Sequence, residues 1–268
     1  MKRFLLQDYD IVDRCVEELK EAEGKVLSNC FLDPEEAERL VRAGRLEMEY
    51  REGEWLNLYC RDDGFFRLYY YLLSGDNYQA GADGILIADL FYREGNRPDP
   101  AKEAVKILEN AGFTATDTYS RWNRKVDADP DRRPDGRTGS VPDEAFAGLL
   151  YSCFDKYKDC LPLREEWEQY TAEHRFIRYP AEGQPAGGVV WKKKGSVVTE
   201  EYIFTDAAQR KKKIAGYLHE QLCAEAFGNG EKGKLIAWVN ETNTASQALH
   251  TSCGYTKDAM KKTVMRKG

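Results

Sequence analysis

Two hydrophobic periodicities alternate along the N-terminal half of the chain. Apolar residues at helical spacing predict helices, and an alternating apolar and polar pattern predicts an antiparallel meander over residues 45–74. The predicted helices cover residues 8–22, 33–44 and 99–112, and two further predicted strands cover 84–93 and 114–122. Only a short turn, 74–84, separates the meander from the next strand, so no long helix fits there.

The C-terminal half repeats this alternation. Its central feature is a predicted strand over residues 196–205, followed by a basic turn, Arg210 to Lys213, and a helix that ends near residue 227. The closing residues 255–267 form one bent strand or a hairpin. The other predicted helices cover 141–157, 163–174 and 243–253, and the other predicted strands cover 175–180, 187–194 and 235–240.

A linker separates the two series. Residues 127–140 combine two prolines, two glycines and alternating charges, which is typical of a linker. We therefore predict two domains, 1–130 and 136–268. Residues 104–114 and 246–256, 142 positions apart, both contain a short helix, a Gly-aromatic corner and a strand start, which favours two related domains.

Composition and charge narrow the range of ligands and partners that fit this chain. The chain is 42% hydrophobic and 32% charged, which supports folded cores. Its net charge of −6 is distributed unevenly, because residues 1–135 carry a net charge of −9 and residues 136–268 carry a net charge of +3. An anionic ligand is therefore expected in the C-terminal half, and the acidic total argues against a nucleic-acid partner.

The cysteines and histidines point to a reduced, metal-free protein. Seven cysteines without a CxxC pair indicate free thiols and a cytoplasmic location, and three histidines, widely spread, argue against a zinc site. We expect no signal peptide and no membrane partner, because no apolar run approaches the length of a transmembrane helix.

The basic turn has two interpretations, an anion site or a solvated helix start. The start of a helix offers unpaired N–H groups and partial positive charge to a phosphate. Two motifs favour the anion site, namely the loop from Arg210 to Ala215 and the helix and corner from Asn243 to Tyr255. Through these motifs, residues 136–268 resemble the GNAT superfamily of acetyl-CoA-dependent N-acyltransferases. The pyrophosphate-loop pattern (Q/R)xxGx(G/A) corresponds to Arg210 through Ala215. The family's Asn-led helix and Gly-aromatic corner correspond to Asn243, Ser246, Leu249, His250, Gly254 and Tyr255.

The resemblance implies a fold and a cosubstrate. Each domain would be α/β (α+β), with a mixed, mostly antiparallel twisted sheet flanked by helices. Acetyl-CoA would bind the second domain, its pantetheine arm pairing with the strand and Asn243 steadying the arm near its thioester end. Ser246 is a further implied cofactor-binding residue. The implied strand residues are Ile203, Phe204 and Thr205, and the implied pyrophosphate loop and helix start are Arg210, Lys211, Lys212, Lys213, Ile214, Ala215 and Gly216.

Two departures from the family pattern bear on activity. Lys213 replaces the first glycine of the loop, where a Cβ could crowd the phosphates or the side chain could add a cation. His250 stands where many members have the tyrosine that protonates the leaving thiolate, and a histidine can do this near neutral pH. The alternative is that His250 is only a partly buried polar residue.

Glu201 is the preferred candidate for the general base. Glu200 and Glu201 are adjacent on the strand and therefore face opposite sides of the sheet. Glu201 shares its side with Ile203 and Thr205, as the base often does in the family. A carboxylate that only faces solvent, or a base acting through water, is the alternative.

The predicted function is N-acetyl transfer from acetyl-CoA to a primary amine by direct attack, the acceptor being a small molecule or a peptide. The alternative is a non-catalytic module that senses CoA or another anion. The N-terminal domain lacks the pyrophosphate loop in its sequence, so it is predicted to be degenerate and not to bind CoA. The protein is expected to be a monomer or a homodimer.

Overall fold

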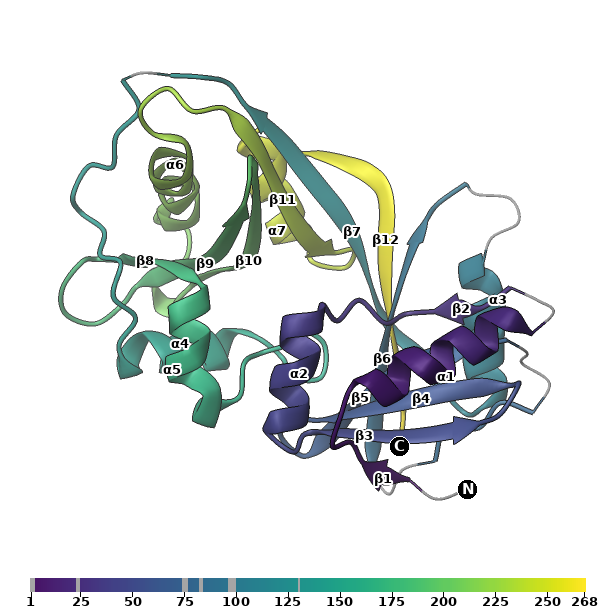
Figure 1. The fold of residues 1–268 in the computed structure, drawn as a ribbon. Coiled ribbons are helices and arrows are strands. Elements are labelled where there is room, and N and C mark those ends of the chain that lie inside the picture. The colour runs from purple at the N-terminus through teal and green to yellow at the C-terminus, as the bar shows by residue number, and fades with distance from the viewer. Residues whose placement is uncertain (1–2, 23–24, 74–76, 82–83, 96–99, 130) are drawn as a thin grey trace. The chain divides into compact units, whose positions relative to one another are not determined.

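The structure, a computed structural model, describes residues 3–22, 25–73, 77–81, 84–95, 100–129 and 131–268. It consists of two compact units (Figure 1). Unit 1 contains Met1–Thr118 and Met260–Gly268, and unit 2 contains Tyr119–Ala259. The predicted α/β class is confirmed, with mostly antiparallel sheets flanked by helices. The domain limits 1–130 and 136–268 stay a prediction, because strands β7 (Thr114–Val126) and β12 (Thr256–Lys267) each continue from one unit into the other.

The sheet of unit 1 has the strand order β1-β3-β4-β5-β6, with β2 beside β5 and residues 260–267 of β12 beside β6. Its neighbouring strands are antiparallel except for the parallel pair β5 and β6. The strands are β1 (Phe4–Leu5), β2 (Leu27–Ser28), β3 (Leu46–Arg51), β4 (Trp55–Arg61), β5 (Phe65–Leu72) and β6 (Ile85–Arg93). The helices are α1 (Asp10–Glu21), α2 (Pro34–Arg42) and α3 (Pro100–Asn110).

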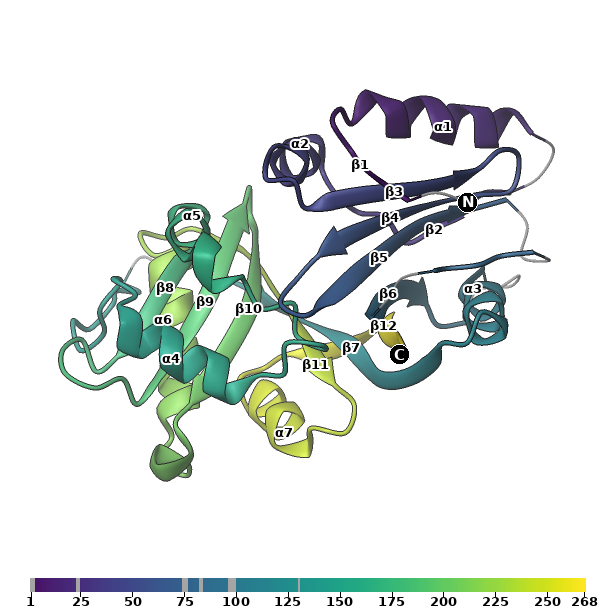
Figure 2. The same cartoon turned by 90° about the horizontal axis from the view of Figure 1, so that it is seen from below.

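Helices cover both faces of this sheet (Figure 2). Helices α1 and α2 pack their apolar residues, such as Val16 and Leu40, against β3 and β4. Helix α3 packs on the other face, through Ile107 and Leu108. The short connection between β5 and β6 adds the buried residues Tyr78 and Ala80 to the same core. Among the described residues of this connection none is helical, as the sequence predicted.

The parallel strands of unit 1 separate after a short pairing, and the chain itself fills the gap. The β5–β6 register runs only from Phe65–Ile85 to Arg67–Ile87. Beyond it, β2 pairs with the end of β5, and the buried Asn29 side chain lies between the strands. Its Nδ2 donates to the carbonyls of Leu68 (3.0 Å) and Asp89 (3.1 Å), and its Oδ1 accepts from the Tyr70 N–H (2.7 Å). Asn29 thus bridges the backbones of both strands by hydrogen bonds at the point where their pairing has ended.

Unit 2 has the strand order β7-β11-β10-β9-β8, again with one parallel pair, β10 and β11. Helix α6 covers one face of β8 to β10, and α4 and α5 cover the other (Figure 1). The strands are β8 (Arg175–Tyr179), β9 (Gly187–Lys194), β10 (Val197–Thr205) and β11 (Gly233–Asn240). The helices are α4 (Glu144–Cys153), η1 (Arg164–Glu166), α5 (Trp167–Glu173), η2 (Ala207–Gln209), α6 (Ile214–Phe227) and α7 (Thr244–Ser252).

The two Gly-aromatic corners have the same backbone geometry. Gly112 and Gly254 both adopt positive φ, 89° and 80°. In each corner the N–H of the aromatic residue bonds the carbonyl five residues earlier, Phe113 to Leu108 and Tyr255 to His250, at 2.9 Å. This is the pattern of a Schellman helix end, which needs the left-handed conformation that glycine adopts freely. The repeat seen in the sequence is therefore repeated in three dimensions.

The structure also bears on the closing strand, the shortest strands, the cysteines and the length of the helices. Residues 256–267 form one strand, not a hairpin, and the two-residue strands β1 and β2 were not predicted because they are too short to show a pattern. All seven cysteines are free thiols. Within the described residues, no helix combines the length and apolar character that crossing a membrane requires.

Glu225, on α6, should make stability depend on pH. Burial raises the pKa of its carboxyl from 4.5 to about 7, although Arg175 opposes the shift. A carboxyl with a raised folded-state pKa costs stability as pH rises from the unfolded value through the folded one. We expect Glu225→Gln to raise the free energy of unfolding at pH 8 by about 1–2 kcal/mol, after a discount for partial exposure, and to have no such effect at pH 4.

Urea unfolding at the two pH values measures this difference. Glu220→Gln is the matched control, because Glu220 is exposed on the same helix, and its effect should be the same at both pH values. An equal gain for Glu225→Gln at pH 4 and pH 8 would contradict the assignment.

Candidate functional site

The central strand of unit 2 loses one neighbour halfway along its length. The parallel register of β10 with β11 runs from Val197–Lys234 to Glu200–Ala237. Beyond Glu200, β10 continues to Thr205 and stays paired with β9 on its other side. Among the described strands, none pairs with the β11-facing edge of β10 from Glu201 onward. Along this edge the backbone of Ile203, Phe204 and Thr205 therefore has no described strand partner, and its role in binding an extended ligand stays a prediction.

A β-bulge in β10 decides which of the later strand residues share a side with Glu201. The register of β10 with β9 shifts between Glu200 and Tyr202. Glu200 lies opposite α6 and α7, whereas Glu201 contacts Tyr170 on α5. Tyr202 also points to this side, where its hydroxyl donates to the carbonyl of Cys160. Glu201 therefore does not share its side of the sheet with Ile203, because the extra residue breaks the alternation.

The basic loop after β10 leads into α6 without a side-chain cap. Asp206 caps the preceding short helix η2, and Lys212 Nζ donates to Gln209 Oε1 (2.7 Å). Helix α6 begins at Ile214, and Lys213, at its N-cap, makes no side-chain cap hydrogen bond. The first N–H groups of a helix have no partner within the helix. Those of Ile214, Ala215 and Gly216 are therefore available to an anion.

Lys213 adopts a left-handed backbone conformation that glycine takes more easily than lysine. Its φ and ψ are 62° and 16°, the left-handed region, and Lys211 has a φ of 65°. This conformation costs a residue with a Cβ about 1–2 kcal/mol. The backbone of the loop at this position therefore suits glycine, and the backbone of Lys213 is strained.

We expect Lys213→Gly to raise the free energy of unfolding by about 0.5–1 kcal/mol, because the relieved strain exceeds the added freedom of the unfolded chain. Chemical denaturation measures the change. Lys212→Gly is the control, since Lys212 does not have a positive φ, and it should lower stability instead. Equal losses for both variants would contradict a strained Lys213.

Asn243 and Ser246 have structural roles at the start of α7. Asn243 is the N-cap, and its side chain accepts from the Ser246 N–H at 3.0 Å. The Ser246 carbonyl lies 2.7 Å from His250 Nδ1, and the Ser246 hydroxyl lies 3.3 Å from the same nitrogen. Both residues therefore position the helix that carries His250.

Glu201 lies in a network of its own. Its carboxylate is 2.7 Å from Lys192 Nζ and 3.0 Å from His174 Nε2, and it accepts from the Tyr170 hydroxyl at 3.1 Å. Burial alone would raise the pKa of Glu201, but His174 and Lys192 outweigh it and hold the pKa at about 2. Glu201 is ionised at neutral pH, but its basicity is low.

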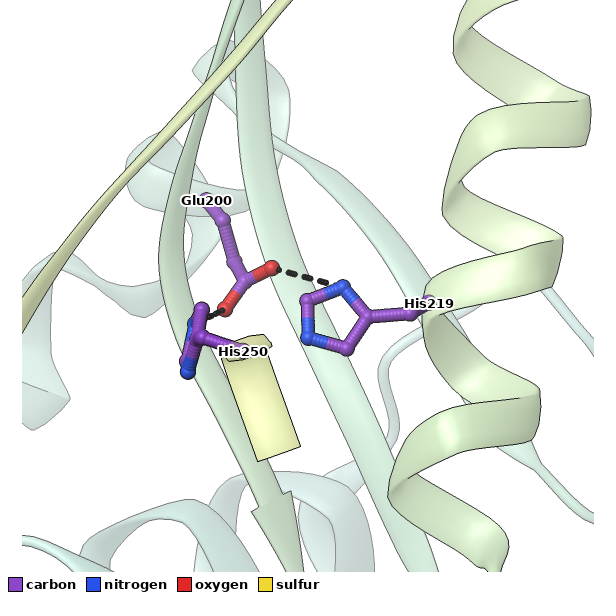
Figure 3. Close-up of side chains that lie close together, drawn as sticks. All are labelled: Glu200, His219 and His250. Atoms are coloured by element: carbon purple, nitrogen blue, oxygen red, sulfur yellow. Dashed lines mark hydrogen bonds and ion pairs between the residues drawn. The ribbon is translucent and has the colours of Figure 1, made fainter. Parts of the chain in front are cut away.

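Glu200 meets both other histidines of the chain in the core (Figure 3). His250 Nε2 lies 3.2 Å from Glu200 Oε1, and His219 Nδ1 lies 3.2 Å from Glu200 Oε2. The Tyr255 hydroxyl donates to Oε2 at 3.3 Å. All four side chains are buried.

The two histidines carry different charge. Burial lowers the pKa of His250, but the hydrogen bond and charge of Glu200 outweigh it, so the pKa is raised. Because Nδ1 faces the Ser246 carbonyl and Nε2 faces a carboxylate, both nitrogens of His250 donate. Burial lowers the pKa of His219 and dominates the opposing effect of Glu200, so His219 is neutral. Although His219 Nδ1 lies 3.2 Å from Glu200 Oε2, the two side chains do not form a salt bridge, because the imidazole is uncharged.

Sequence reasoning singled out His250 and Glu201, ranked Glu200 below Glu201 as a candidate base, and did not name His219. The fold brings His250 to Glu200 and leaves Glu201 on the other face. One signal could have found His219, since it falls at helical spacing on the apolar face of α6 with Leu222 and Ala226. The sequence analysis argued against a zinc site because the three histidines are widely spread, and the fold brings two of them, His219 and His250, to one carboxylate.

Comparison with known proteins gives a family for this unit. Residues 144–255 match the family described as Acetyltransferase (GNAT) family. This segment contains the basic loop, the bulged strand and the Gly254–Tyr255 corner. A search of curated proteins finds no match.

Solved structures share the fold of the whole chain. An acetyltransferase from the GNAT family of Colwellia psychrerythraea superposes with a TM-score of 0.53 at 13% identity, covering 100% of both chains. A tandem GNAT protein from the clavulanic acid biosynthesis pathway gives a TM-score of 0.52 at 14% identity, covering 99% of this chain and 97% of that one. A GCN5-related N-acetyltransferase from Sphaerobacter thermophilus gives 0.52 at 13% identity, covering 99% and 95%. Because the sequence identities are so low, these comparisons show that the fold is similar and show nothing further about this chain.

Proposed function

Because residues 144–255 form an acetyltransferase domain of the GNAT family, we propose that the protein is an N-acetyltransferase that transfers an acetyl group from acetyl-CoA to a primary amine. The acceptor is a small molecule or a peptide. The observation that carries the proposal is the uncapped start of α6, directly after a strand whose edge is open.

The described groups match the parts of acetyl-CoA. The N–H groups of Ile214, Ala215 and Gly216 would donate to the pyrophosphate, and Arg210 and the lysines beside it would balance its charge. The open backbone edge of β10 at Ile203–Thr205 would pair with the amides of the pantetheine arm, as an added strand does.

The reaction needs two proton transfers. The amine nitrogen attacks the thioester carbon, the C–S bond breaks, the nitrogen loses a proton and the sulfur gains one. We propose that Glu201 accepts the first proton and that His250, held in its doubly protonated form by Glu200, supplies the second through Nε2.

Unit 1 is proposed to hold no acetyl-CoA. In unit 1 the place between the diverging strands β5 and β6 is filled by Asn29, whereas the corresponding edge of β10 has no described strand partner. The connection between β5 and β6 also contains no helix among its described residues. One acetyl-CoA per chain is therefore expected.

Calorimetry and an amine panel test the proposal together. Titration with acetyl-CoA should give one equivalent bound, and a thiol-release assay should identify an amine that increases CoA production. Absence of binding at millimolar acetyl-CoA would overturn the proposal. Clear binding with no thiol release across small amines and peptides would favour a non-catalytic sensor instead.

The base assignment predicts a loss of activity for Glu201→Gln, which removes the charge and keeps the shape. We expect kcat to fall by about 10- to 100-fold, less than the largest contributions of general bases, because a carboxylate with a pKa of about 2 is a weak base. Glu173→Gln is the control, an exposed carboxylate at the end of α5. A fall of less than about 10-fold would assign Glu201 to positioning Lys192 and His174 instead.

A further inference from the structure

Three potential metal ligands converge in the core of unit 2 (Figure 3). Glu200 comes from β10, His219 from α6 and His250 from α7, and each offers one ligand atom within 4.8 Å of the others. Their side chains are 2%, 1% and 2% exposed, so the group is no solvated surface cluster. An isolated carboxylate and two imidazoles are costly to bury unless they are paired or bind a cation.

His250 is oriented as a metal ligand usually is. Its Nδ1 donates to the Ser246 carbonyl at 2.7 Å, which fixes the ring and leaves Nε2 pointing to Glu200. Metal-binding histidines commonly donate their second nitrogen to a backbone carbonyl or a carboxylate. The start of α7, held by the Asn243 cap, supplies this carbonyl.

His219 has no hydrogen bond to explain its burial. Among the described residues, neither Nδ1 nor Nε2 has a partner of suitable geometry, although the ring is almost fully enclosed. Nδ1 nevertheless points toward the cluster and lies 3.2 Å from Glu200 Oε2. A buried polar atom without a partner costs free energy, and a cation on Nδ1 would remove that cost for this atom.

We propose that Glu200, His219 and His250 form a binding site for one Zn²⁺ ion. Two imidazoles and one carboxylate are a common ligand set for zinc. Ligand atoms about 2.0–2.1 Å from a tetrahedral ion lie roughly 3.3 Å apart. Glu200 Oε1 lies 3.2 Å from His250 Nε2, and Glu200 Oε2 lies 3.2 Å from His219 Nδ1. Each imidazole is thus at about this spacing from one oxygen of the shared carboxylate, and one ligand atom from each residue lies within 4.8 Å of the others.

The zinc site does not depend on the proposed acetyl transfer. The two are linked in one respect, because His250 Nε2 cannot hold a zinc ion and a proton at the same time. Zinc at this site would release that proton to solvent and remove the proposed acid. Bound zinc should therefore inhibit the transferase.

Competition with a chromophoric zinc chelator tests the site directly, and it works whether or not the protein is a transferase. We expect the wild type to bind one more equivalent of Zn²⁺ than His219→Leu, whose affinity at this site should fall by more than about 100-fold. The seven thiols can also bind zinc, so the difference between the variants is the measurement. His174→Ala, which removes the third histidine of the chain, is the control and should keep the extra equivalent.

His219→Leu should fold, because it replaces a buried ring that makes no hydrogen bond. Without zinc it should melt at or above the temperature of the wild type, and zinc should raise the melting temperature of the wild type only. If leucine does not fold, His219→Gln serves as the second variant. Co²⁺ provides a spectroscopic readout, with a tetrahedral visible spectrum expected for the wild type. Equal zinc binding by the wild type and the His219 variant, or no stoichiometric zinc in the wild type, would overturn the proposal.

Discussion

Gly216→Asp should abolish acetyl-CoA binding without unfolding the protein. Gly216 lies in the first turn of α6, and a Cβ there would meet no atom within 4 Å. An aspartate in this turn favours the helix, because it complements the helix dipole and replaces glycine. The same carboxylate would face the bound pyrophosphate. Like charges 4 Å apart at an effective dielectric constant of 20 repel by about 4 kcal/mol, so we expect affinity to fall by at least about 100-fold.

Gly216→Ala separates the charge from the side chain itself. It gains helix propensity without an acid, so it should bind acetyl-CoA within a few-fold of the wild type. Calorimetric titration of acetyl-CoA and thermal melting measure binding and stability on the same samples. Unchanged affinity in Gly216→Asp would place the pyrophosphate away from α6 and contradict the proposed site. Joint loss of affinity and folding would instead show that Gly216 has a packing role.

Asn29→Ala should cause a large loss of stability in unit 1. The Asn29 side chain makes three hydrogen bonds to the backbone of diverging strands, to Leu68, Tyr70 and Asp89. Alanine cannot replace them, and each buried backbone group left unpaired costs about 1–3 kcal/mol. We expect the free energy of unfolding to fall by about 3–5 kcal/mol in urea denaturation.

Two variants at neighbouring atoms test this explanation. Asn29→Asp keeps an acceptor for the Tyr70 N–H but presents an oxygen to the carbonyls of Leu68 and Asp89, so it should be about as destabilising as alanine. Ser28→Ala removes an exposed hydroxyl on β2 that accepts from the Cys30 N–H at 3.0 Å, and it should lower stability by about 1 kcal/mol or less. A neutral Asn29→Asp would show that the two donated hydrogen bonds do not hold the strands.

Most of the local structure follows from residues close together in the sequence. Asp33 caps α2 by accepting from the Glu36 N–H at 2.9 Å, and Pro34 takes the first helical position, as their order predicted. Gly254 ends α7 with a positive φ. These elements were predictable because caps, helix ends and hydrophobic periods depend on a few neighbouring residues.

The details of the site were less predictable, because they depend on pairing between distant segments. The bulge at Glu201 arises from the register of β10 with β9, and the pattern of apolar and polar residues along β10 did not predict it. Glu201 faces Lys192 and His174, opposite to Glu200, as strand alternation predicted. The extra residue places Tyr202 on that same side, so Ile203 faces away from Glu201. The left-handed conformation of Lys213 is another such detail, since lysine is not the residue type that normally signals it.

The sequence by itself determined the order of the elements, the two related halves and the basic turn before a helix, because each of these depends on local patterns. Only the tertiary structure decided that Asn29 fills the space between the strands of unit 1 and that Glu200, His219 and His250 meet in unit 2. The physical reason is distance along the chain. Glu200 and His250 are separated by 50 residues, and a contact between them exists only once β10, α6 and α7 have packed around one core.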